Sequence, residues 1–133
     1  MDTLLFIHSL LRWLILLVAV AALAKLAYGW LRAGIFDGID RGLVMGYSGL
    51  LDLQALLGLI LLFGNGFVGG EGFPLPRILH AIVMILAVVA GHLAGRGKTD
   101  PAKARYRRAL AAIAGSLVLV LIGIIILAAG QGS

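Results

Sequence analysis

The residues best suited to chemistry in this sequence are polar side chains that lie inside long apolar stretches. His8 and His80 each stand near the start of such a stretch, about one helical turn from its end. Imidazole nitrogen is a strong axial ligand for haem iron, and a porphyrin requires an apolar slot. Two histidines at similar depth on separate helices therefore point to one haem b with His8 and His80 as its iron ligands. The alternative is that both rings only lie at the headgroup boundary, where amphipathic side chains are common.

Arg12 and Asp52 are the charged residues that stand deepest in apolar sequence. Arg12 follows His8 by four residues, so both lie on one helix face. Asp52 stands near the middle of the next stretch, at about the depth that Arg12 reaches. Because either charge alone costs about 2.5–3.5 kcal/mol at a helix centre, we expect a buried ion pair between them. Three roles stay open: the pair fixes helix register, Arg12 also neutralises a haem propionate, or Asp52 exchanges a proton beside a quinone or an ion.

Two further residues are weaker candidates. Met84 follows His80 by one turn, but methionine in an apolar helix usually serves packing. His92 lies twelve residues after His80, about 18 Å along a helix, and no other histidine stands at its depth. We therefore expect one haem only, with His92 at the membrane boundary or against a loop.

Four apolar stretches must position these residues. Of 133 residues, 62% are hydrophobic and 13% are charged, whereas a soluble domain carries about 25% charged residues. The stretches cover residues 4–28, 43–63, 78–95 and 109–129, and a spanning helix needs about 20 apolar residues. Glycine, proline and charged residues fill the segments between them. The sequence predicts an all-α integral membrane protein, a four-helix bundle that forms a single domain over residues 1–133.

Composition also excludes several kinds of site and partner. The chain has no cysteine, which excludes disulfides, iron–sulfur clusters and the covalent attachment of c-type haem. Its net charge of +5 comes from residues that flank apolar helices, so the predicted partner is the lipid bilayer and not nucleic acid. The sequence contains no nucleophile elbow, phosphate-binding loop or H-E-x-x-H motif.

The distribution of basic residues predicts the orientation in the membrane. Lysine and arginine gather on the side of the first and third interhelical segments and are nearly missing from the other side, following the positive-inside rule. The gathered residues are Lys25, Arg32, Arg41, Arg96, Lys98, Lys103, Arg105, Arg107 and Arg108. We therefore expect a multi-pass protein of the bacterial inner membrane, with both termini on the periplasmic or extracellular side.

The string His8-Ser9-Leu10-Leu11-Arg12-Trp13 resembles a motif of small bacterial four-helix membrane proteins known as cytochrome-b-like. The stretch 54–60, His80 and the basic stretch 95–108 extend the resemblance over most of the chain. It implies a b-type haem protein that moves electrons, with His8 and His80 as ligands. Members of this group often carry histidine where this chain has Asp52, so a ligand from the second helix is not expected here.

These observations lead to three hypotheses. The first is a small membrane cytochrome that binds one haem b between the first and third helices, near the outer face, and exchanges electrons with quinone or other membrane redox subunits. The second is a haem-free accessory subunit of a larger membrane complex. The third is a proton-coupled transporter or channel, which four short helices would form only as an oligomer. Enzymatic activity and homo- or hetero-oligomerisation stay open.

Overall fold

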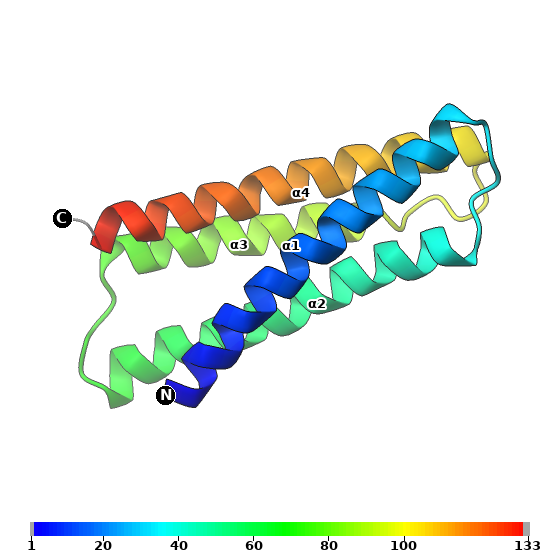
Figure 1. Ribbon diagram of the computed structural model, residues 1–133. Coiled ribbons are helices and arrows are strands. Elements are labelled where there is room, and N and C mark those ends of the chain that lie inside the picture. The colour runs from blue at the N-terminus through cyan, green and yellow to red at the C-terminus, as the bar shows by residue number, and fades with distance from the viewer. Residues whose placement is uncertain (1, 132–133) are drawn as a thin grey trace.

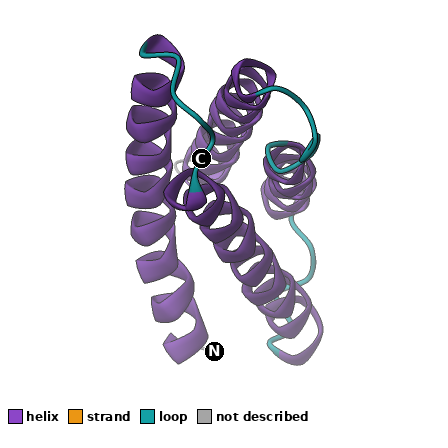
Figure 2. Ribbon diagram, turned by 90° about the vertical axis from the view of Figure 1, so that its right-hand side faces the viewer, coloured by secondary structure: helices purple, strands orange, loops and turns teal. Residues whose placement is uncertain are grey.

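The computed structural model of the protein describes residues 2–131, and these residues form four long helices without a strand (Figure 2). The helices are α1 (Asp2–Leu31), α2 (Gly38–Phe63), α3 (Leu75–Leu93) and α4 (Ala102–Gln131). A π-helical turn, η1 (Gly64–Val68), extends α2. The predicted all-α four-helix fold is confirmed, and α1, α2 and α4 are longer than the apolar stretches that predicted them.

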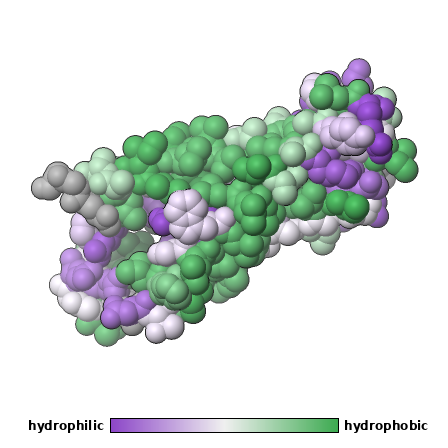
Figure 3. Space-filling view, viewed as in Figure 1, coloured by the Kyte–Doolittle hydropathy of each residue, from purple (hydrophilic) through white to green (hydrophobic). Residues whose placement is uncertain are grey.

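Each of the four helices is long and apolar enough to cross a membrane. Large hydrophobic side chains such as Leu17, Val118 and Ile125 are exposed along their outer surfaces. Figure 3 shows this apolar surface between two polar ends. Burial against lipid accounts for such a surface, because a soluble protein rarely exposes continuous apolar area of this extent. The chain is therefore a multi-pass membrane protein.

The helices form an up-and-down bundle in which α1 and α3 lie diagonally opposite each other. The sides of the bundle are the contacts of α1 with α2, α2 with α3, α3 with α4, and α4 with α1. Both ends of the described chain lie at one end of the bundle, beside the connection 64–74 (Figure 1). We call this the glycine-rich end. The opposite end, which carries the connections 32–37 and 94–101, is called the basic end.

Small residues and short polar bridges hold the middle of the bundle together. Ala19, Ala22 and Ala87 are fully buried, which lets the helix backbones approach closely. The Tyr47 hydroxyl donates to Ser116 Oγ at 2.9 Å, and Ser116 Oγ donates to the Ala87 carbonyl at 2.7 Å. Because each buried hydroxyl has a partner, this polar chain is compatible with an apolar core.

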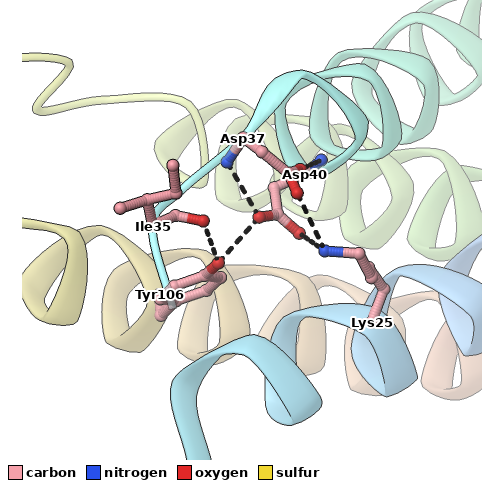
Figure 4. A network of polar contacts seen from close by, with 5 residues as sticks. All are labelled: Lys25, Ile35, Asp37, Asp40 and Tyr106. Carbon is pink, nitrogen blue, oxygen red and sulfur yellow. Dashed lines mark hydrogen bonds and ion pairs between the residues drawn. The ribbon is translucent and has the colours of Figure 1, made fainter. Parts of the chain in front are cut away.

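The basic end is closed by a polar network that sequence reasoning missed (Figure 4). Asp40, whose side chain is fully buried, accepts from Lys25 Nζ at 2.8 Å and from the Tyr106 hydroxyl at 2.8 Å. The same hydroxyl lies 2.6 Å from the Ile35 carbonyl, so its single proton is shared between the two acceptors. Asp37 caps α2, because its carboxylate accepts a hydrogen bond from the Asp40 backbone N–H. In turn, the Asp40 carboxylate accepts a hydrogen bond from the Asp37 backbone N–H, which completes a capping box. The network joins α1, α2, α4 and the first connection.

Candidate cofactor-binding site

The centre of the bundle is hollow toward the glycine-rich end. Two adjoining cavities, of about 210 and 240 Å³, lie among the four helices. His8 from α1 and His80 from α3 line both cavities. The other residues shared by both linings are Leu5, Leu51, Gln54, Met84 and Leu127. The structure thus brings the two predicted ligand residues to one largely apolar space, from diagonally opposite helices.

The His80 ring is held in an orientation suited to a metal ligand. Its Nδ1 lies 2.7 Å from the Gly123 carbonyl of α4. A carbonyl only accepts hydrogen bonds, so Nδ1 carries the proton and Nε2 keeps its lone pair. Histidines that ligate metals commonly show this second bond to a carbonyl. A Cβ at Gly123 would lie 2.8 Å from Met84 Sδ and 3.4 Å from His80 Nδ1, so glycine leaves room for the Met84 side chain beside the ring.

The backbone around His8 is fixed by Gln54 of α2. The Gln54 amide donates to the His8 carbonyl at 2.7 Å, and Gln54 is 4% exposed. Gly58 allows the ring to lie against α2, because a Cβ at Gly58 would be 3.2 Å from His8 Cε1. Two buried atoms here, His8 Nδ1 and Gln54 Oε1, have no hydrogen-bond partner among the described residues. Buried orphan atoms in a native site call for an explanation, and a ligand in the cavity provides one.

Arg12 lines the second cavity without an acidic partner. Its guanidinium lies 5.2 Å from the Trp13 ring centroid, and in residues 2–131 it forms no ion pair or hydrogen bond. An unpaired cation within the span favours an anionic group in the adjoining cavity.

The expected ion pair between Arg12 and Asp52 is not formed. Asp52 Oδ1 instead lies 2.7 Å from His92 Nε2, and both side chains are about half exposed, at 48% and 53%. The physical reason is the rotation of α2 about its axis. Leu51 and Gln54 face the core, which turns Asp52 outward toward α3, away from Arg12.

His92, which was expected at a membrane boundary or against a loop, lies in the last turn of α3 and contacts Asp52 of α2. Gly91 packs closely on α2, since a Cβ at Gly91 would lie 3.1 Å from Leu51 Cδ1. Ser48 Oγ donates to the Gly91 carbonyl at 3.1 Å in the same contact. The antiparallel register of α2 and α3, together with the small residue before His92, is the signal that could have found this pair.

The donor set suits a planar cofactor that brings most of its own metal ligands. Among the described residues no group of three or more histidine, cysteine or acidic side chains could hold a bare metal ion. Two imidazoles across an apolar space, with Arg12 beside it, fit a haem, whose iron needs two axial nitrogens and whose propionates need a cation. Comparison of the chain with protein-family models, curated proteins and solved structures finds no match.

Proposed function

We propose that this protein binds one haem b between α1 and α3, with His8 and His80 as axial ligands, and transfers electrons within the membrane. The observation that carries the proposal is the His80 ring, whose Nδ1–H is bound by the Gly123 carbonyl while its Nε2 is free, in a cavity that His8 also lines. When bound, the haem supplies a one-electron redox centre.

The remaining lining residues have supporting roles in this proposal. Leu5, Leu51 and Leu127 exclude water from the ligand faces. Arg12 offers its guanidinium to a propionate, which gives an unpaired cation its counter-charge. Gln54 is a positioning residue, because its hydrogen bond to the His8 carbonyl fixes the position of α1 along α2.

The proposed electron partner is a membrane quinone or a neighbouring redox subunit, since the site lies within the lipid-covered part of the bundle. We propose that the basic end faces the cytoplasm and the glycine-rich end faces the periplasm or exterior, following the positive-inside rule. The haem then lies in the outer half of the bilayer.

Absorption spectra test the proposal. The protein is expressed with haem available and purified in detergent, and oxidised and dithionite-reduced spectra are recorded. We expect sharp Soret and alpha bands in the wild type and their loss in both His8→Ala and His80→Ala. His92→Ala is the matched control, because this histidine lies outside both cavities, and its spectrum should equal that of the wild type.

Two results would contradict haem ligation by this pair. One is a folded but colourless wild type after haem supplementation, which would favour the haem-free accessory subunit. The other is a wild-type spectrum in His8→Ala or in His80→Ala.

Met84→Leu tests whether the Met84 thioether, and not an imidazole, is a ligand. We expect the absorption bands of this variant to equal those of the wild type. Circular dichroism confirms the fold of every variant.

A further inference from the structure

A polar pair faces outward from the membrane-spanning part of α2 and α3. His92 Nε2 lies 2.7 Å from Asp52 Oδ1, with the side chains 53% and 48% exposed. Asp52 stands fourteen residues after Gly38 and eleven before Phe63, so it lies about 21 and 16 Å from the two ends of α2 at 1.5 Å per residue. Asp52 thus stands near the middle of α2 and His92 in the last turn of α3, so the pair lies within the span toward the basic end, on a surface that a monomer would present to lipid.

Each member of this pair has hydrogen-bonding capacity that the chain leaves unused. Nδ1 of His92 and Oδ2 of Asp52 have no partner among the described residues. Hydrocarbon offers no replacement for these bonds, so ionisable groups in spans normally face protein or a water-filled space.

The neighbouring surface of α2 is unusually flat. Gly42, Gly46 and Gly49 are exposed, and a Cβ at any of them would meet nothing within 4 Å. Their spacing of four and three residues places them on one side of the helix, and Asp52 continues the row three residues later. Small residues in such a row let two helices approach closely in a membrane.

We propose that the face formed by Gly42, Gly46, Gly49, Asp52 and His92 is the contact surface for a second copy of this chain. A twofold axis along the membrane normal keeps both copies in the same orientation and brings identical faces together at equal depth. In the dimer that we propose, each His92 donates from both ring nitrogens, one to its own Asp52 and one to the free carboxylate oxygen of the other copy's Asp52. The face is complementary to itself in charge, which favours a second copy over an unrelated subunit.

Cross-linking in membranes tests the contact. The chain has no cysteine, so one introduced thiol reports one position, and a disulfide forms only where two Cα atoms come within about 7 Å. We expect Gly46→Cys to yield a covalent dimer on oxidation. Gly115→Cys on α4 is the matched control: its Cβ space is equally open, and the adjacent Ser116 is bonded to Tyr47, which places it at similar depth. It should stay monomeric.

The affinity of self-association tests the role of the polar pair. Donor- and acceptor-labelled copies are reconstituted in vesicles of phosphatidylcholine and phosphatidylglycerol, and fluorescence energy transfer is measured at several protein-to-lipid ratios. The dependence of energy transfer on this ratio gives the dissociation constant. We expect Gly46→Ile and the double variant Asp52→Leu/His92→Leu to weaken association at least tenfold, with Gly115→Ile unchanged. The open space at both glycines keeps the larger side chains from disturbing the monomer.

A wild type that stays monomeric at low lipid dilution would overturn the proposal and leave a different membrane protein as the occupant of the face. Equal cross-linking at residues 46 and 115 would overturn it as well, since that result indicates random collision. The inference does not rest on haem: colourless protein should dimerise as well as haem-loaded protein, so failure of either proposal is recognised separately.

Discussion

Buried polar residues fall into two groups according to whether their hydrogen bonds are made. Asp40 and Tyr106 at the basic end have every oxygen atom bonded, to Lys25, Ile35 and the first turn of α2. Near the cavities, His8 Nδ1 and Gln54 Oε1 lack partners. A satisfied buried network contributes stability, whereas unsatisfied groups around a cavity indicate a ligand. The two groups therefore call for different measurements.

Removing the Tyr106 hydroxyl should destabilise the protein. In Tyr106→Phe the Ile35 carbonyl and Asp40 Oδ2 lose their contact with the hydroxyl, and Oδ2 keeps only the bond from the Asp37 N–H; a lost hydrogen bond to a charged group costs about 1.5–3 kcal/mol. Tyr28→Phe is the control, because Tyr28 is exposed and its ring contact with Arg32 needs no hydroxyl. Unfolding by denaturant in detergent should show a lower free energy of unfolding for Tyr106→Phe alone; equal values would contradict a stabilising role for this network.

The cap of α2 should make stability sensitive to acid. The backbone N–H of Asp40 donates to the Asp37 carboxylate and lowers the pKa of Asp37 below its ordinary value of about 3.9. A lowered folded-state pKa contributes stability that is present above the ordinary value and is lost as the pH falls through the lowered one. The unfolding midpoint of the wild type should therefore decrease as the pH is lowered below about 3.9, the ordinary pKa of aspartate.

Asp37→Asn separates this contribution from those of the other carboxylates. Asparagine is an equally good N-cap and its amide oxygen accepts the same bond, but it does not titrate. The midpoint of this variant should decline less steeply with acid than that of the wild type. Parallel curves would show that Asp37 has no part in the acid sensitivity.

At the scale of the helices, the bundle depends on glycine where two backbones come closest. Gly29 of α1 is buried against α4, and a Cβ there would lie 2.6 Å from the Tyr106 ring. The ring has little freedom to move away, since its hydroxyl is bonded to Asp40 and Ile35. The contact of α1 with α4 at the basic end therefore requires glycine at this position.

Gly29→Ala should destabilise the protein by about 1–3 kcal/mol, the usual effect of added volume in a packed core. Gly115→Ala is a control of opposite sign: its Cβ would meet nothing within 4 Å, so alanine should be neutral or stabilise the helix by up to about 1 kcal/mol. Thermal unfolding in detergent compares the two variants. A tolerated Gly29→Ala would indicate a looser contact of α1 with α4 than the structure shows.

For the whole molecule, the two ends differ in both charge and packing. The basic end is closed by the network of Lys25, Asp40 and Tyr106, and the glycine-rich end contains the cavities. The arrangement places a rigid, charged end on one side of the bilayer and the proposed cofactor site toward the other. The sidedness proposed for that arrangement rests on the positive-inside rule.

Labelling of single cysteines in intact cells tests this sidedness. Val68 and Thr99 are exposed at opposite ends of the bundle, and the chain has no other thiol. A membrane-impermeant maleimide should label Val68→Cys and should reach Thr99→Cys only after the membrane is disrupted. The reverse pattern would place the cavities in the cytoplasmic half.

The sequence by itself determined the four helices, their capacity to span a membrane and the asymmetry of charge. These properties are local, because a run of about 20 apolar residues is enough to specify a span. For the same reason the similar depths of His8 and His80 could be predicted from their places near helix starts. Which side of the membrane they face, and whether they bind haem, stay predictions.

Tertiary structure decided which side chains meet. A residue's depth follows from its position along a helix, but its direction depends on rotation about the helix axis, and one residue changes that direction by about 100°. In the packed bundle Leu51 of α2 is buried beside Gly91 of α3, and with the helices in this rotation Asp52 pairs with His92 and not with Arg12. The bonds of Gln54 to His8 and of Tyr106 to Asp40 join residues distant in sequence, and only the packing of all four helices brings them together.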